Sequence, residues 1–96
     1  MPLSPGEFSE LKRSIASKSF EDSKLTIAKQ VVGNACLLSS QVKELMLLFS
    51  FEESRLELAK FAYGRTYDIG NYYKVNDAFT FESSIDELNQ YISRGR

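Results

Sequence analysis

The residue types that usually carry enzymatic chemistry are scarce in this chain of 96 residues. Histidine is absent and Cys36 is the single cysteine. Without histidine, neither a Ser-His-Asp nor a Cys-His arrangement can exist, and the commonest metal ligand is missing. Cys36 is predicted to be a small buried hydrophobe on the apolar face of the second helix. We therefore expect no catalytic residues, no metal and no cofactor, and we expect that the chain is not an enzyme.

Carboxylates are the remaining candidates for acid–base or metal chemistry. Glu52 and Glu53 are adjacent and fall in the expected first turn of a helix, where capping explains acidic residues. Residues 68–77 are rich in Asp and Asn oxygens, but their spacing matches no calcium loop. Turn formation is the better interpretation, and this segment is predicted to be the least regular part of the chain after the termini.

Tyrosines form the one cluster that suggests recognition. Four of the five lie between Tyr63 and Tyr73, a span of eleven residues. Two adjacent tyrosines cannot both face inward, so one ring is expected to plug the core and the other to lie on the surface. The candidate binding surface comprises Tyr72, Tyr73, Arg65 and Lys74. The alternative, that the tyrosines only complete the core, stays open.

The elements that must position these residues are predicted to be helices. Ser4-Pro5-Gly6-Glu7 has the pattern of a capped helix start, and the first helix should run from Pro5 to Ser17. Ser19 and Asp22 are expected to cap a second helix in the same way, and Ser50 and Glu53 a later one. Ser83 and Ser84 offer overlapping caps for a last helix that closes near Gly95.

Two segments of the chain nearly repeat each other. SFEDSKLTIAK, from Ser19 to Lys29, matches SFEESRLELAK, from Ser50 to Lys60, at seven of eleven positions. The matches comprise a helix start and one apolar stripe, so they read as a degenerate helical repeat. Four residues of the two stripes are predicted to lie in the core: Leu25, Ala28, Leu56 and Ala59. The fold class predicted is all-α, a compact globule of five or six short helices.

Length and charge limit the remaining possibilities. The expected organisation is a disordered tail over residues 1–3 and a single helical domain over residues 4–94. Net charge is −1 with the signs interspersed, which excludes the basic footprint of a nucleic-acid binder. No apolar run approaches the ~20 residues that span a bilayer, so no direct membrane insertion is expected. The N-terminus lacks the pattern of a signal peptide.

The sequence also resembles a known family. The runs SFEDSKLTIAKQ, LSSQVKELMLLFSFEESRLELAKFAY and DIGNYYKVNDAFTFESSIDELNQYI are similar to a small all-helical domain of unknown function, number four thousand four hundred and seventy-six in that series. The resemblance covers Phe8 to Ile92. It implies a domain often found at the C-terminus of exported bacterial lipoproteins, and so a longer, membrane-anchored parent in the periplasm or at the cell surface. It supplies no activity and no catalytic residues.

These observations favour a non-enzymatic interaction or binding domain with a protein, peptide or glycan partner. Two alternatives stay open: an accessory domain of a hydrolase that acts on cell-surface polymers, and a structural spacer without a ligand. A shallow aromatic patch would favour binding, because tyrosine offers a large stiff face with a polar tip. A deep pocket lined by several carboxylates would favour the enzyme.

Overall fold

A computed structural model describes residues 3–95, and within them the chain is all-helical, without a β-strand. The elements are α1 (Pro5–Ala16), α2 (Glu21–Asn34), α3 (Ser39–Met46), α4 (Glu52–Tyr63), the 3-10 helix η1 (Ile69–Ala78) and α5 (Glu82–Arg94). The predicted all-α class and the number of helices are confirmed. Of the expected tail, residues 1–2 lie outside the described residues, and Leu3 packs against the core.

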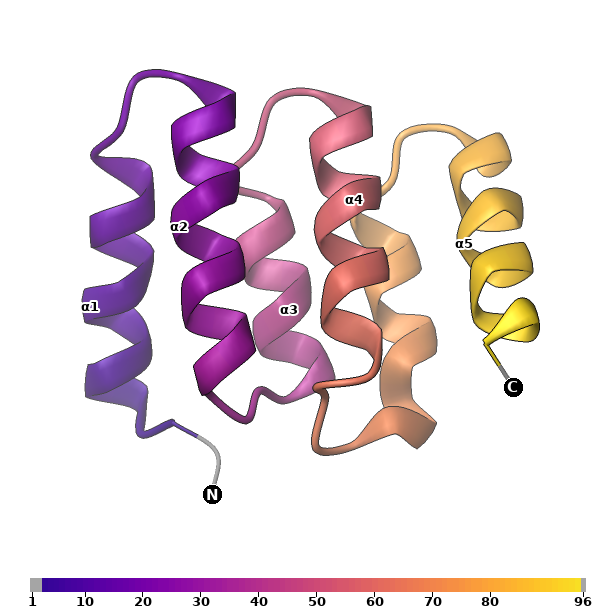
Figure 1. The fold of residues 1–96 in the computed structure, drawn as a ribbon, viewed down its shortest axis with the longest axis horizontal. Coiled ribbons are helices and arrows are strands. Elements are labelled where there is room, and N and C mark those ends of the chain that lie inside the picture. The colour runs from indigo at the N-terminus through magenta and orange to yellow at the C-terminus, as the bar shows by residue number, and fades with distance from the viewer. Residues whose placement is uncertain (1–2, 96) are drawn as a thin grey trace.

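The helices form two layers (Figure 1). One layer contains α1, α2, α4 and α5 side by side, and each of these helices packs on the next. Behind it lie α3 and η1, which pack against each other and against α4. The chain passes to the rear layer after α2 and after α4, and it returns to the front layer after α3 and after η1. The N-termini of α2, α4 and α5 therefore all lie at the same edge, the top of Figure 1.

The first helix starts as its sequence predicts. The Ser4 hydroxyl accepts a hydrogen bond from the Glu7 amide at 3.2 Å, and the Glu7 carboxylate accepts one from the Ser4 amide at 3.0 Å. These bonds satisfy donors that an α-helix leaves unpaired in its first turn. Phe8, Leu11 and Ile15 are buried on one face, as their helical spacing requires.

Glu21 provides the N-terminal cap of another helix, α4. Its carboxylate accepts hydrogen bonds from the Ser50 amide at 3.1 Å and from the Phe51 amide at 3.0 Å. Burial of the carboxylate raises its pKa, but the bonds from the Phe51 and Ser50 amides outweigh that effect, so the pKa of Glu21 lies below its usual 4.5. The first residue of α2 thus holds the start of α4.

Glu52 does the same for α5. Its carboxylate accepts the Thr80 and Phe81 amides, both at 3.0 Å, and the Ser84 hydroxyl at 2.7 Å. Burial again raises the pKa, while the Ser84 hydroxyl and the two amides lower it more, so the pKa of Glu52 lies below 4.5. Glu82 holds the matching first-turn position in α5, where no later helix follows within residues 3–95.

The predicted local caps of these helices are therefore wrong. The residues before α2, α4 and α5 are phenylalanines, and none of these helices has a side-chain cap from its own N-cap residue. The serines expected to act as caps do not occupy the N-cap position. Ser19 and Ser50 precede the N-cap residue, while Ser83 and Ser84 lie within the first turn of α5.

Most of the predicted core is present. Ala28 and Ala59 are fully buried where α2 packs on α4, and Leu56 is buried beside them. Small side chains at this contact let the two helices approach closely. Leu25 is only partly buried, so that part of the prediction is wrong. Cys36 is a second correction, because α2 ends at Asn34 and the free thiol is partly buried in the segment before α3.

The segment predicted to be least regular is instead a long 3-10 helix. Residues 69–78 form ten residues of η1, where runs of three or four are usual. Tyr72, Val75 and Ala78 recur every third residue and are all buried. A 3-10 helix has three residues per turn, so this spacing places all three side chains on one face, against α3 and α4.

The two caps generate a stability prediction. Glu21→Ala and Glu52→Ala should each lower the free energy of unfolding by about 1–2 kcal/mol, because each leaves helix-start amides without their acceptor. Glu82→Ala, at the matching position with no helix to cap, should change it by less than about 0.5 kcal/mol. Urea unfolding of the three variants provides the comparison. Equal losses in all three would contradict the role assigned to Glu21 and Glu52.

Candidate functional site

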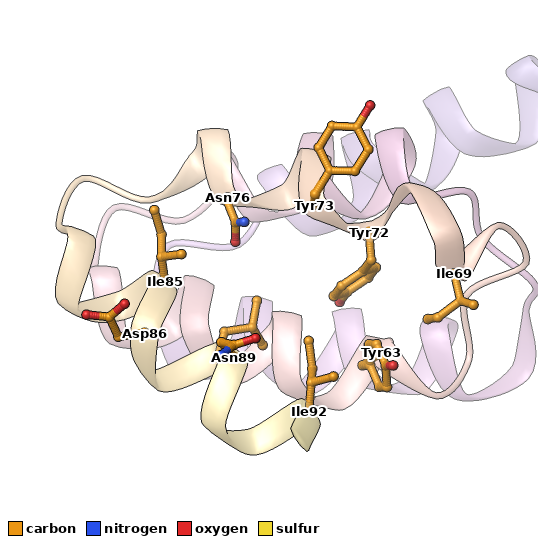
Figure 2. A pocket seen from close by; sticks show the side chains of 10 residues that line it. Tyr63, Ile69, Tyr72, Tyr73, Asn76, Ile85, Asp86, Asn89 and Ile92 are labelled. Atoms are coloured by element: carbon orange, nitrogen blue, oxygen red, sulfur yellow. The ribbon is translucent and has the colours of Figure 1, made fainter. Parts of the chain in front are cut away.

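A cavity of about 400 Å³ lies between η1 and α5 (Figure 2). Aromatic and branched apolar side chains are mixed in its lining with amides and one carboxylate. The lining residues are Tyr63, Ile69, Tyr72, Tyr73, Asn76, Ile85, Asp86, Leu88, Asn89 and Ile92. This mixture of apolar walls with a few polar groups is typical of ligand sites.

Tyr72 forms the inner wall of the cavity. Its ring is only 5% exposed, and its hydroxyl donates a hydrogen bond to the Ala59 carbonyl oxygen of α4. The Tyr63 ring packs edge-on against it, with centroids 5.3 Å apart. Burial, with a smaller contribution from Tyr63, raises the pKa of the Tyr72 phenol well above its usual value of 10. Tyr72 therefore stays neutral and links η1 to α4.

Tyr73 differs from its neighbour as predicted. Its side chain is 66% exposed, so one tyrosine of the pair is a core plug and the other a surface ring. Residues of a 3-10 helix rotate by about 120° each, which explains the change of face. Figure 2 shows the Tyr73 ring directed away from the cavity, while Tyr72 points into it. Tyr73 thus belongs to the rim of the cavity and not to its interior.

The two predicted cations do not line this cavity. Arg65 lies over the Phe61 ring, 4.2 Å from its centroid, and donates a hydrogen bond to the Phe61 carbonyl oxygen. It lines a second cavity, of about 510 Å³, near the C-terminal ends of α4 and α5. Lys74 is exposed and lines neither cavity. Of the four predicted residues, Tyr72 and Tyr73 therefore line the cavity between η1 and α5, and Arg65 and Lys74 do not.

The second cavity holds aromatic rings and cations that are already engaged with protein groups. Lys60 pairs with Glu87 at 2.9 Å and lies over the Tyr91 ring. Arg65 is stacked on Phe61 as described above. Both cations lie near helix C-termini, where positive charge complements the helix dipole. The cavity between η1 and α5 is therefore the stronger candidate for a binding site.

Sequence reasoning missed the polar groups that α5 contributes to the first cavity, Asp86 and Asn89. Counted from their Phe-Glu pairs, Asp86 of α5 corresponds to Leu25 and Leu56, which begin the apolar stripes of α2 and α4. Asn89 corresponds in the same way to the buried alanines Ala28 and Ala59. The signal was present in the sequence as a departure of the third Phe-Glu segment from the other two.

Two further findings concern function. Among residues 3–95, no three Cys, Asp or Glu side chains are grouped so that they could hold a metal ion. Within the same residues, no helix combines the length and the apolar character that crossing a membrane requires.

The fold and the cavity define a small all-α domain of two helical layers. The family model described as Domain of unknown function (DUF4476) matches residues 2–92, and the chain belongs to this family. No curated protein and no solved structure matches the chain.

The tyrosine pair generates the second prediction. Tyr72→Ala should lower the free energy of unfolding by about 3–5 kcal/mol, as truncation of a buried aromatic ring does. Tyr72→Phe, which removes only the hydrogen bond to Ala59, should cost about 1 kcal/mol. Tyr73→Ala should change stability by less than about 0.5 kcal/mol. Thermal unfolding of the three variants gives their order of stability. A Tyr73→Ala variant as unstable as Tyr72→Ala would contradict this prediction.

Proposed function

We propose that this domain is a non-enzymatic interaction domain, and that it binds a partner protein by taking a lysine or arginine side chain into the cavity between η1 and α5. The domain would serve within a longer exported or surface protein, as the family resemblance implies. Its two matching segments, which begin α2 and α4, would be units of a degenerate helical repeat that builds the scaffold.

The observation that carries the proposal is the polar character of α5 where the matching helices are apolar. Asp86 and Asn89 line the cavity, and both residues are exposed. If α5 also carried apolar residues at positions 86 and 89, packing alone would explain this face of the helix. Polar side chains placed in a cavity with apolar walls instead suit a ligand that offers hydrogen-bond donors.

The charge of the lining indicates which ligand fits. Asp86 is the one charged residue among those that line the cavity, and no lysine or arginine accompanies it. A cationic group is therefore favoured and an anionic one is not. The amide oxygens of Asn76 and Asn89 can accept further hydrogen bonds. Ile85 and Ile92 offer apolar contact to the aliphatic stem of a lysine or arginine.

A binding role is favoured over catalysis for chemical reasons. The chain has no histidine, and the cavity is lined by a single carboxylate. Hydrolysis of glycosidic bonds by carboxylates uses a pair of them. Asp86 alone can pair with a cation but cannot supply both carboxylates of such a pair.

Nuclear magnetic resonance titration tests this function. The probes are three blocked pentapeptides that carry Lys, Gln or Glu at the centre of four alanines. The Lys peptide should shift the side-chain amide signals of Asn76 and Asn89, and the Glu peptide should not. The double variant Asp86→Leu with Asn89→Ala, which restores the residues found in α4, should weaken Lys-peptide binding about tenfold or more, since the paired charge is lost.

Lys74→Ala is the matched control, because Lys74 lies on η1 but outside the cavity. Equal response to the Lys, Gln and Glu peptides would contradict the proposal. A response to a neutral oligosaccharide such as maltotriose, without a response to the Lys peptide, would favour the accessory domain of a polymer hydrolase. No response to any probe at millimolar concentration would favour the spacer.

A further inference from the structure

Three phenylalanines occupy the position directly before α2, α4 and α5. Phe20, Phe51 and Phe81 are the N-cap residues of these helices, and their side chains are 75%, 63% and 59% exposed. We call this set the phenylalanine ridge. Helix N-caps are usually Ser, Thr, Asp or Asn, because those side chains can accept a hydrogen bond from the first turn. Phenylalanine has no side-chain atom that can accept such a hydrogen bond.

Two phenylalanines of the ridge have a backbone amide that is bound by a carboxylate from the preceding outer helix. Glu21 accepts hydrogen bonds from the amides of Ser50 and Phe51, directly before α4, and Glu52 accepts them from Thr80 and Phe81, directly before α5. The backbone of Phe51 and of Phe81 is thus held in place while the rings stay exposed. Exposed phenylalanine is costly in water, at about 25 cal/mol per Å² of apolar surface. Three such rings at matching places indicate a surface that a partner covers.

The ridge has a regular spacing. The N-termini of α2, α4 and α5 lie at one edge of the molecule, the top of Figure 1, and the three helices pack side by side. Packed helices lie about 8–10 Å apart, so the N-cap residues recur at about that distance. A polyproline II helix repeats every three residues, or about 9 Å, and therefore presents equivalent residues at the same spacing.

The charges beside the ridge select among the possible occupants. Asp22, Glu53 and Glu82 are exposed next to the rings. Three cations lie in the same segments: Lys18, and the partly buried Lys24 and Arg55, which donate hydrogen bonds to backbone carbonyl oxygens. Glu21 and Glu52 add two further carboxylates that already hold amides. A second copy of this ridge or an anionic lipid surface would be repelled by these carboxylates. A cationic partner would be attracted.

We propose that the phenylalanine ridge is a docking surface for a proline-rich, cationic peptide segment in the polyproline II conformation. Proline rings would pack between the exposed phenylalanines, as in other aromatic surfaces that recognise this conformation. Lysine or arginine side chains on the third column of the peptide would pair with Asp22, Glu53 and Glu82. This surface is separate from the cavity between η1 and α5, and the inference does not depend on the function proposed for that cavity.

The test uses a blocked peptide of about twelve residues that repeats the triplet Pro-Pro-Lys and so adopts polyproline II. Isothermal calorimetry should detect its binding to the domain. Phe20→Ala, Phe51→Ala and Phe81→Ala should each weaken the affinity about tenfold, as loss of an aromatic anchor does. The triple variant should not bind. All these variants should keep the wild-type melting temperature, because the rings are exposed and do not cap.

The matched control variant is Tyr67→Ala, which removes an equally exposed aromatic ring away from the ridge and should leave the affinity unchanged. A Gly-Ser-Lys repeat of equal charge and a Pro-Pro-Glu repeat of opposite charge should bind at least tenfold more weakly. Absence of Pro-Pro-Lys binding, or binding that the triple phenylalanine variant retains, would overturn the proposal. So would ridge-dependent binding to vesicles of phosphatidylcholine and phosphatidylserine, or ridge-dependent dimerisation, in place of peptide binding.

The two binding proposals can be tested independently of each other. Asp86→Leu with Asn89→Ala should keep Pro-Pro-Lys binding at the ridge and lose the response of Asn76 to the Lys pentapeptide. The triple phenylalanine variant should lose Pro-Pro-Lys binding and keep the response of Asn76 to the Lys pentapeptide. If either variant lost both Pro-Pro-Lys binding and the response to the Lys pentapeptide, the two sites would form one continuous surface. That result would overturn the proposal of a separate ridge.

Discussion

The arrangement of this domain depends on two carboxylates that each cap the helix of a neighbouring segment. The first turn of an α-helix leaves four amides without a partner inside the helix, and they need acceptors from elsewhere. Glu21 accepts from the N-cap amide of α4 and from the amide before it, and Glu52 does the same at α5, across 28 to 30 residues of sequence. Helix α2 therefore fixes the start of α4, and α4 fixes the start of α5.

This constraint shapes both candidate binding surfaces. The exposed pair Lys60–Glu87 adds little to the position of α5, since such pairs contribute about 0–1 kcal/mol. The Glu52 cap and the burial of Leu88 hold α5 instead, at a place where it leaves a cavity against η1. The same two carboxylates bind the backbone amides of Phe51 and Phe81, whose side chains stay exposed.

Much of the fold could be predicted from the sequence, and the failures have a common cause. Apolar spacing predicted the helices and the buried Ala28 and Ala59, because periodicity is local. The caps predicted for α2, α4 and α5 were wrong because the capping-box rule considers only residues three apart, while Glu52 acts on amides far along the chain. Residues 68–77 were judged by their turn-forming types, although Tyr72 and the next two buried residues recur with the period of a 3-10 helix. Asp86 was missed because only apolar positions were compared.

The most direct test of this account is the measurement of side-chain carboxyl pKa values by carbon-detected magnetic resonance titration. The account predicts that Glu21 and Glu52 both titrate below 4.5, because their ionised forms accept amide hydrogen bonds that protonation would weaken. A pKa lower in the folded state than in the unfolded state stabilises the fold above the unfolded value, and that stability is lost as the pH falls through the folded one. A pKa at or above 4.5 for both glutamates would contradict the account.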